Sequence, residues 1–266
     1  EVVAIDDLST GSRANHDGTG IRLVEATILD ADALDDACSG AAAIVHLAAL
    51  PSVPRSVIDP MASHHANATG TLEVLQAARR AGDLHVVVAS SSSVYGANRE
   101  LPKRETMRTV PISPYAVSKQ ATESYALSFG HTYGLPVLAF RFFNVYGPLQ
   151  PAGHAYAAVV PTFIDAALRG LPLTVHGDGE QTRDFTYIGT VSNVLADAVV
   201  QFDRQPTPLA LLRIDDASGH RAQAGREASR FFFGAPPLAQ VDHRGLRGNE
   251  AAVTIAYGGH VQRSGK

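Results

Sequence analysis

Short hydrophobic runs rich in β-branched residues alternate with helical patterns through the first half of the chain. Strands are predicted at residues 2–6, 21–26, 43–48, 85–90 and 137–142. The 3.6-residue spacing of apolar positions predicts helices at residues 32–38, 66–81 and 114–133. Strands that are hydrophobic along their whole length are those that helices bury on both faces. The alternation therefore predicts an α/β fold, a doubly wound parallel sheet with a site at the carboxyl ends of its strands.

The pattern beyond Phe142 is less regular. We predict helices at residues 160–169 and 192–202, a strand at 173–176, and a strand at 186–188 that returns to the main sheet. From about Gln205 the helical periodicity is lost, and only residues 251–257 are typical of a strand. We therefore expect an irregular tail beyond residue 205.

Composition excludes several kinds of partner. The 266 residues carry a net charge of −4, with 45% hydrophobic and 18% charged residues, as in ordinary soluble globular proteins. No polybasic run indicates nucleic acid or a membrane surface, and no apolar stretch reaches the ~18 residues of a membrane span. The single cysteine, Cys38, fits a reducing cytoplasm and is interpreted as a packing residue. No histidine or cysteine spacing typical of a metal site occurs, so no metal is expected.

Tyr115 and Lys119 are four residues apart on the predicted helix 114–133, so they lie on one face, one turn from each other. An ammonium group near a phenol favours the phenolate, which lowers the pKa of the tyrosine from its usual value of about 10. Such a tyrosine can accept a proton. By itself the spacing is a weak indication, since a half-buried Tyr beside a solvated Lys has the same pattern.

Six motifs accompany this pair in a fixed order. They are IDDLSTG (5–11), HLAA (46–49), SSSSVYG (90–96), SPYAVSK (113–119), RFFNVYG (141–147) and GDGEQTRDF (177–185). Together they resemble the extended short-chain dehydrogenase/reductase family, specifically its NAD-dependent sugar-nucleotide 4-epimerases. The resemblance extends from Glu1 to about Phe202. It implies a Rossmann-like fold, NAD as cofactor, a UDP-sugar as substrate and a homodimer.

The same resemblance suggests a division of the chain. Residues 1–145 with 183–203 would form an incomplete NAD-binding domain, and residues 146–182 with 204–266 a substrate-binding part. The family's G-x-x-G-x-x-G loop, which offers backbone N–H groups to the pyrophosphate, is expected before Glu1. We therefore expect the first βα unit, a central part of the sheet, to be missing from these residues. Ala26-Thr27 stands where the family usually has Gly-Asp.

The catalytic residues implied by the resemblance are Tyr115, Lys119 and Ser91. Tyr115 would take the proton from the sugar O4, Lys119 would lower the pKa of Tyr115 and hold the nicotinamide ribose, and Ser91 would hydrogen-bond O4. Ser92 and Ser93 stand where related 4,6-dehydratases carry an Asp-Glu pair. Two hydroxyl groups cannot serve as the acid and base that remove water, which argues against a dehydratase.

The implied binding residues form two sets. Those for the cofactor are Asp6, Asp7, Ile28, Leu47, Ala48, Ala49, Asn67, Ser90, Tyr115, Lys119 and Phe142. Those for the substrate are Ser91, Ser92, Asn144, Val159 and Arg183. Asp6 ends a strand, where a carboxylate can accept ribose hydroxyls, although a surface turn would also explain it. A helix N-cap explains Asn67 nearly as well, and a salt bridge to Asp184 is the alternative for Arg183.

The function implied is that of an NAD-dependent epimerase that interconverts UDP-sugars at C4 through a 4-keto intermediate. Two alternatives stay open: a non-catalytic relic of the family, and a sugar-nucleotide reductase or decarboxylase of the same fold. Residues 49–56 and 153–161 resemble the UDP-N-acetylglucosamine 4-epimerases and favour an N-acetylated sugar.

Overall fold

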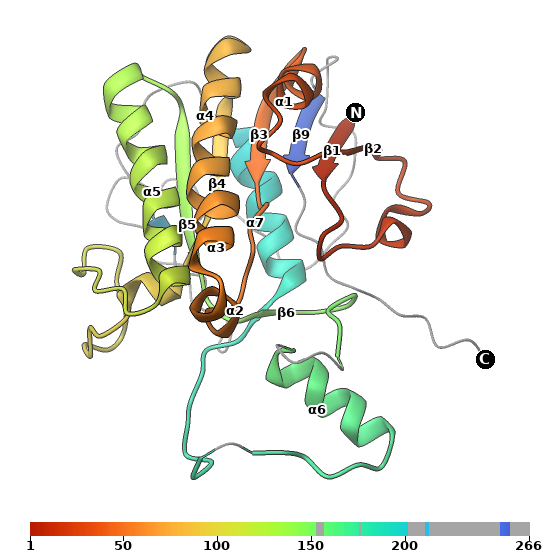
Figure 1. Ribbon diagram of the computed structural model, residues 1–266, viewed down its shortest axis with the longest axis vertical. Coiled ribbons are helices and arrows are strands. Elements are labelled where there is room, and N and C mark those ends of the chain that lie inside the picture. Colours follow the sequence, from red (N-terminus) through yellow and green to blue (C-terminus); the bar gives the residue numbers. More distant parts are fainter. Residues whose placement is uncertain (153–156, 176, 202–210, 213–250, 256–266) are drawn as a thin grey trace.

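A seven-stranded parallel sheet forms the centre of the molecule (Figure 1). The computed structural model describes residues 1–152, 157–175, 177–201, 211–212 and 251–255. In spatial order the strands are β2 (Arg22–Glu25), β1 (Val2–Asp6), β9 (Ala251–Ile255), β3 (Ala41–His46), β4 (His85–Ser91), β5 (Val137–Phe142) and β8 (Leu211–Leu212). Every neighbouring pair is parallel. The predicted Rossmann-like, doubly wound fold is confirmed.

The central strands are buried on both faces, as their hydrophobic runs predicted. Along β4, Val86 and Val88 pack into the core on one side of the sheet, and Val87 packs into the core on the other. Side chains of a strand alternate between its faces, so each core receives every second residue. All three valines are fully buried. Each contributes roughly 1.5–3 kcal/mol of burial free energy.

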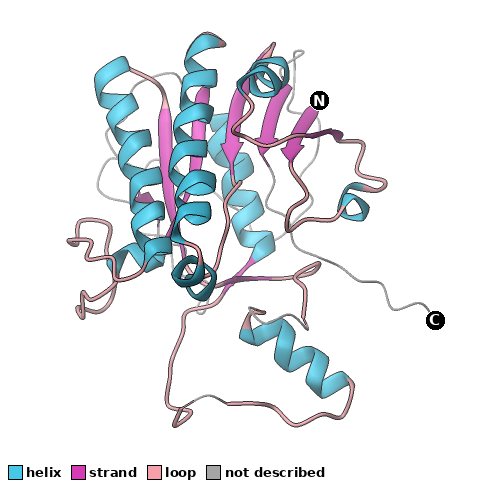
Figure 2. Ribbon diagram, viewed as in Figure 1, coloured by secondary structure: helices cyan, strands magenta, loops and turns pink. Residues whose placement is uncertain are grey.

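Three helices cover the first face of the sheet (Figure 2). They are α1 (Ala31–Cys38), α4 (Gly70–Arg80) and α5 (Pro114–Tyr133). Leu34 of α1, Leu75 of α4 and Phe129 of α5 meet in the larger core cluster. Cys38 belongs to the same cluster, and burial raises the pKa of its thiol to about 11. Its interpretation as a packing residue is confirmed.

The second face of the sheet is covered by α7 (Ile188–Gln201), which lies behind the strands in Figure 1. Val194 and Leu195 of α7 pack against Leu138 and Phe140 of β5. The predicted helix at 192–202 therefore begins four residues earlier, and Phe202 lies outside the described residues.

The predicted helix at 66–81 consists of two different pieces. A π-helical turn, η2 (His65–Thr69), precedes α4 and follows the short helices α2 (Val53–Ile58) and α3 (Pro60–His64). The helix axis is continuous at Gly70, where a Cβ atom would lie 2.4 Å from Cδ1 of Ile28. Any larger residue at position 70 would require the buried side chain of Ile28 to shift.

The strand predicted at residues 251–257 is confirmed as β9, although its place in the main sheet was not expected. β9 lies between β1 and β3 and pairs with both, so the central position expected to be empty is filled by residues 251–255. β8 extends the opposite edge beside β5. Residues 204–266 were assigned to a substrate-binding part, but these two segments belong to the main sheet.

Two predictions for the segment between β5 and α7 were wrong. Residues 186–188 do not return to the main sheet: β7 (Thr186–Tyr187) pairs with β6 (Val145–Tyr146) in a separate two-stranded sheet. Residues 173–175 form no strand, because no described strand pairs with them and Leu173 and Val175 are exposed. The helix α6 (Val159–Leu168) agrees with prediction within one residue, and Figure 1 shows it beyond the carboxyl edge of the main sheet.

Candidate active site

Helix α5 fixes Tyr115 and Lys119 at the carboxyl edge of the sheet. Its bounds follow from three residues: Ser113 caps the first turn by accepting from Ala116 N–H at 3.1 Å, Pro114 occupies the first position, and Gly134 ends the helix at φ 72°. The backbone N–H of Tyr115 donates to Ser56 Oγ at 3.0 Å, which ties this turn to α2.

The Ser91 hydroxyl faces the phenol of Tyr115 and acts to lower the pKa of that phenol. It ends β4 and caps the short helix η3 (Ser92–Tyr95). Its Oγ accepts from the backbone N–H of Ser93 at 3.2 Å and from Ser93 Oγ at 2.9 Å. A hydroxyl accepts two hydrogen bonds and donates one. The proton of Ser91 is therefore left to donate toward Tyr115, which favours the phenolate.

The electrostatics of the pair differ from the sequence-based expectation. Burial raises the pKa of Tyr115, and the hydroxyl of Ser91 opposes that effect. Lys119 is 5% exposed, and its Nζ donates to the carbonyl oxygen of Ala89 at 2.8 Å. Burial lowers the pKa of Lys119 to about 8. Lys119 was predicted to lower the pKa of Tyr115, but Ser91 has that effect instead. The ammonium group of Lys119 is bonded to the backbone of β4.

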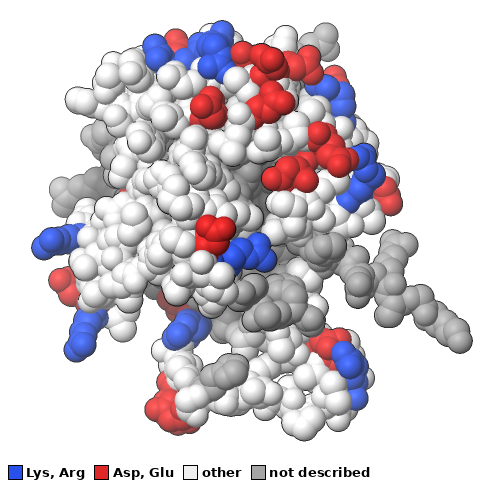
Figure 3. Space-filling model, viewed as in Figure 1, with Lys and Arg blue, Asp and Glu red and all other residues white. Residues whose placement is uncertain are grey.

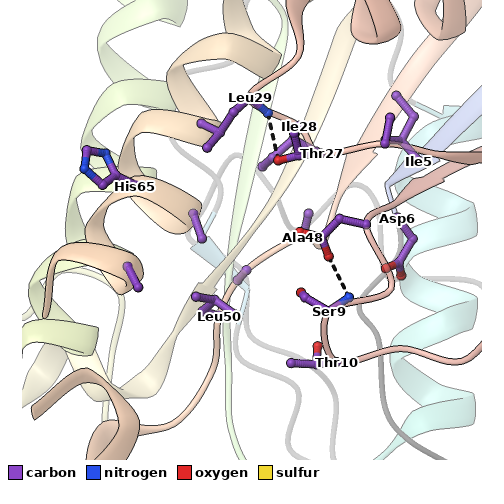
Figure 4. Close-up of a pocket in the computed structure, with 15 residues that line it drawn as sticks. Ile5, Asp6, Ser9, Thr10, Thr27, Ile28, Leu29, Ala48, Leu50 and His65 are labelled. Atoms are coloured by element: carbon purple, nitrogen blue, oxygen red, sulfur yellow. Dashed lines mark hydrogen bonds between the residues drawn. The ribbon is translucent and has the colours of Figure 1, made fainter. Parts of the chain in front are cut away.

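A cavity of about 240 Å³ lies at the carboxyl ends of β1, β2 and β3 (Figure 4). Of the predicted cofactor residues, it is lined by Asp6, Asp7, Ile28, Ala48 and Ala49. Sequence reasoning missed other lining residues, which include Ser9, Thr10, Leu29, Leu50, Ala62, His65 and Ala66. The small residues Ala62 and Ala66, four apart and therefore on one helix face, were the signal that could have found that wall.

The cavity fits the adenosine half of a dinucleotide. Asp6 ends β1 with only 8% exposure, and its Oδ1 accepts from the backbone N–H of Leu8 at 2.7 Å. Burial raises the pKa of this carboxyl group. A carboxylate at a strand end is suited to bind ribose hydroxyls, and the small side chains of Ala48 and Ala49 leave room for a base. None of Ser91, Tyr115 and Lys119 lines this cavity.

Asn67, predicted to contact the cofactor, has its side chain engaged within the protein. Its Oδ1 accepts from the N–H of Leu50 at 2.7 Å, and its Nδ2 donates to the carbonyl of Leu50 at 3.1 Å and to Ser118 Oγ at 2.9 Å. Ser118 donates in turn to the carbonyl of Tyr115 at 2.8 Å. Asn67 therefore connects a wall of the cavity to the turn of α5 that carries Tyr115.

The remaining predicted cofactor residues lie near Ser91 or beside the cavity. Ser90 is buried and donates to Glu123 Oε2 at 2.8 Å. Phe142 is partly buried and stacks on Phe140 with ring centroids 5.8 Å apart. Leu47 is partly exposed and does not line the cavity.

The predicted substrate residues fall into two groups. Ser91 and Ser92 lie together at the end of β4. Asn144 and Arg183 are brought near each other by the small β6–β7 sheet, since Asn144 Nδ2 donates to the carbonyl of Asp184 at 2.8 Å. Arg183 is exposed and donates to the carbonyl of Thr182, and Val159 is exposed at the start of α6. Residues 153–156, part of the N-acetyl motif, lie outside the described residues.

Acidic and basic side chains are interspersed on the face seen in Figure 3. In the part of the chain that the structure describes, no group of three or more His, Cys, Asp or Glu side chains is arranged to hold a metal ion. No helix among the described residues has the length and apolarity needed to cross a membrane.

Comparison with known proteins identifies the family. The model of the NAD dependent epimerase/dehydratase family matches residues 1–210, more than three quarters of the chain. The chain belongs to this family. The resemblance drawn from the six motifs is confirmed, and NAD is the cofactor of the family.

Individual members of the epimerase/dehydratase family differ in their reactions. A probable UDP-glucuronate 4-epimerase from Rhizobium meliloti is 37% identical over 70% of this chain and 53% of its own length. A UDP-N-acetyl-alpha-D-glucosaminuronate decarboxylase from Bacillus cytotoxicus is 35% identical over 70% of this chain and 60% of its own. The chain thus spans between one half and two thirds of these relatives.

A solved structure of the same family contains the cofactor. The UDP-glucose 4-epimerase of Thermus thermophilus in complex with NAD superimposes with a TM-score of 0.72. It is 32% identical, and the match covers 87% of this chain and 75% of that one.

Proposed function

We propose that this chain is an NAD-dependent epimerase that interconverts UDP-sugars at C4. One observation carries the proposal: the hydroxyl of Ser91, held by Ser93, acts on the phenol of Tyr115, one helical turn from the buried Lys119 that is bonded to β4. A phenol with a fixed donor on one side and a cation one helical turn away is suited to accept the proton of a sugar hydroxyl.

In this mechanism Tyr115 takes the proton from O4 of the sugar, and the Ser91 proton, directed toward Tyr115 in the free protein, is donated to O4 when the sugar is bound. NAD, when bound, would supply the reversible hydride transfer at C4. The 4-keto sugar turns over between the forward and return transfers, and Tyr115 then returns the proton to O4. Asn144 and Arg183 would hold the nucleotide diphosphate, for which a guanidinium group is well suited. Asp6, Ala48 and Ala49 would bind the adenosine half of NAD.

Ser92 and Ser93 favour the epimerase over a dehydratase, because neither hydroxyl can act as the acid and base of an elimination. A decarboxylase or reductase of the same fold is the second candidate, supported by the decarboxylase among the relatives. A non-catalytic relic of the family is the third candidate. The residues that line the cavity would bind only the adenosine half of the cofactor.

A single incubation separates these candidates. The purified chain is supplied with NAD and UDP-glucose, UDP-N-acetylglucosamine or UDP-glucuronate, and the products are followed by NMR together with the absorbance of reduced cofactor. We expect the C4 epimer without net cofactor reduction. Net reduction or release of carbon dioxide would assign a reductase or decarboxylase. No product and no bound NAD would assign the relic.

The same experiment tests the sugar preference. We expect UDP-N-acetylglucosamine to be used at least as well as UDP-glucose. A tenfold preference for the plain sugar, about 1.4 kcal/mol of transition-state binding, would contradict this expectation.

We also propose a homodimer formed through α2, α3 and α5. The exposed side chains on these helices include Val57, Ile58, Met61, Val117 and Tyr125. Figure 3 shows a largely uncharged surface on this side of the molecule, interrupted near its middle by adjacent acidic and basic side chains. Met61→Glu is expected to give a monomer by light scattering, whereas Leu168→Glu on α6 leaves the mass unchanged. A monomeric unaltered chain would refute this arrangement. The cytoplasmic location stays a prediction.

A further inference from the structure

A buried ion pair lies behind the candidate catalytic residues. Arg141 of β5 and Glu123 of α5 are joined by two hydrogen bonds, Nε to Oε2 at 2.9 Å and Nη2 to Oε1 at 2.6 Å. Their side chains are only 6% and 7% exposed. Burying two charges costs a large desolvation free energy, and apolar residues of similar size often stabilise a fold equally well. The pair is therefore not explained by stability alone.

The ion pair also holds three other residues. Ser90, the neighbour of Ser91, donates to Glu123 Oε2 at 2.8 Å. Arg141 Nη1 donates to the carbonyl of Glu105 at 3.2 Å. The guanidinium group lies 4.8 Å from the ring centre of Tyr95, and the hydroxyl of Tyr95 donates in turn to the carbonyl of Arg104 at 3.0 Å.

These contacts attach one long segment at its start and middle. Residues 92–113 run from Ser91 to the turn that carries Tyr115, so the segment joins the two groups that must meet at the substrate. Tyr95 lies near its start, and Arg104 and Glu105 near its middle. The second half returns along the first, since Ala97 N–H donates to the carbonyl of Val110 at 3.0 Å and Val110 N–H to that of Val94 at 3.0 Å.

Glu123 acts on the other side as well. It lies one turn beyond Lys119 on α5, and the bond from Ser90 parallels the bond from Lys119 to Ala89. Two adjacent residues of β4 are therefore held by two successive turns of α5. A shift of this helix along the strand would change the distance between Ser91 and Tyr115.

We propose that Glu123 and Arg141 are positioning residues that set the geometry of Ser91 and Tyr115 by anchoring the segment 92–113 between them. The inference rests on the proposed function, because it assigns these residues to that site. Neither side chain needs to touch the substrate. A misplacement of catalytic groups by about 1 Å can lower turnover by about 100-fold, so the anchor has a measurable effect.

The test replaces the ion pair by apolar side chains in the full chain. In the double variant Glu123→Leu/Arg141→Met, buried charge is removed while volume is largely kept, so we expect the Tm to stay within about 4 °C. We expect kcat for the UDP-sugar to fall about 10- to 100-fold, with KM within about threefold and the bound NAD content unchanged. Unchanged kcat in this folded variant would overturn the proposal.

A second measurement does not depend on turnover. Hydrogen exchange followed by mass spectrometry should show at least about tenfold faster exchange in residues 92–113 of the double variant, with no change in α4. If the unaltered chain converts no UDP-sugar, the proposed function fails, while the exchange result still decides whether the pair anchors the segment. Equal exchange in both proteins would overturn the anchor.

The matched control is an exposed ion pair remote from the site. Arg80 donates to both carboxylate oxygens of Asp35, and both side chains are 45% exposed. Asp35→Leu/Arg80→Met is expected to change neither kcat nor the exchange of residues 92–113. If the Glu123/Arg141 variant fails to fold, Glu123→Gln, which keeps the shape and removes the charge, is put through the same two measurements. It should show the same changes at smaller size, and no change in either would refute the proposal.

Discussion

Three hydroxyl groups in a row determine the chemistry at the residue scale. Ser93 donates to Ser91, and the Ser91 hydroxyl acts to lower the pKa of Tyr115. Only the spacing of Tyr115 and Lys119 could be predicted from the helical period. The partner of the Lys119 ammonium group could not, because a long side chain reaches a carbonyl that tertiary packing brings near, here that of Ala89.

Tyr115→Phe is expected to lower kcat by roughly 10²–10⁴-fold, the range of general base catalysis, because the phenol oxygen is the proton acceptor. Steady-state kinetics with UDP-sugar measures the change, and bound NAD reports that the fold is intact. Tyr125→Phe, on the exposed face of the same helix, is the control. Turnover close to that of the unaltered chain would remove Tyr115 from the mechanism.

Ser93→Ala should move the acid limb of the kcat/KM profile to higher pH. Without Ser93 Oγ, Ser91 is free to donate elsewhere, and the influence that lowers the pKa of Tyr115 weakens. Lys119, whose pKa is about 8, is the charged group one turn away, so Lys119→Met is profiled in parallel. An unshifted limb in Ser93→Ala would show that Ser93 does not orient Ser91.

His46 should make the fold sensitive to acid. Burial and the nearby charge of Lys119 lower its pKa to about 3, from an ordinary value of 6.5. Below pH 6.5 His46 binds a proton in the unfolded chain but not in the folded chain. The free energy of unfolding therefore decreases as the pH falls from 6.5 toward 3. The slope is up to ~1.36 kcal/mol per pH unit.

Urea unfolding between about pH 7 and about pH 4 measures that slope. We expect a shallower fall in the free energy of unfolding for His46→Asn than for the unaltered chain, while the exposed His131→Asn retains the full slope. Equal slopes in His46→Asn and the unaltered chain would show that the ring is protonated in the folded state.

The element scale is dominated by the π-helical turn η2, which carries Asn67 between the cavity and α5. Extra residues in a helical turn are frequently retained at functional sites. The bounds of α5 were predictable because Ser113, Pro114 and Gly134 mark its ends locally. The π-helical turn was not, because it is decided by the bonds of Asn67 to Leu50 and Ser118, which are distant in sequence.

Asn67→Ala is expected to lower both the free energy of unfolding and the affinity for NAD. The change leaves partly buried backbone groups of Leu50 without their partner, which costs up to about 1 kcal/mol for each group. Leu50 also lines the cavity, so its displacement weakens NAD binding. Calorimetry of unfolding and of NAD binding measures the two effects, with Asn193→Ala on the exposed face of α7 as control. A loss of affinity with unchanged stability would instead indicate direct contact with the cofactor.

At the scale of the whole molecule, the order of strands is the feature that the sequence could not provide. The alternation of strands and helices predicted the parallel sheet, because it depends on burial pattern alone. The position of β9 depends on which strands have unpaired backbone N–H and C=O groups at their edges. The side chains of residues 251–255 do not indicate which strands those are. The strand predicted at residues 251–257 is present, but its central position in the sheet was not predicted.

Val253→Pro is expected to abolish cooperative unfolding of the sheet, because a proline in a central strand removes a ladder hydrogen bond and cannot be accommodated there. Leu212→Pro in the edge strand β8 is the matched control and should change the free energy of unfolding by less than about 1 kcal/mol. Thermal unfolding followed by circular dichroism compares the two. Equal effects would place β9 outside the centre of the sheet.

Val3 of β1 is paired with Val253 of β9, and among the described strands β9 alone links β1 to β3. On the ribosome, β1 emerges long before this partner, with all the other described strands of the main sheet made in between. Among the described strands, the edge of β1 that faces β9 therefore has no partner until the last strand of the main sheet is made. Such an edge is a template for pairing with other nascent chains. We expect that this protein depends on chaperones during synthesis far more than its ordinary composition suggests.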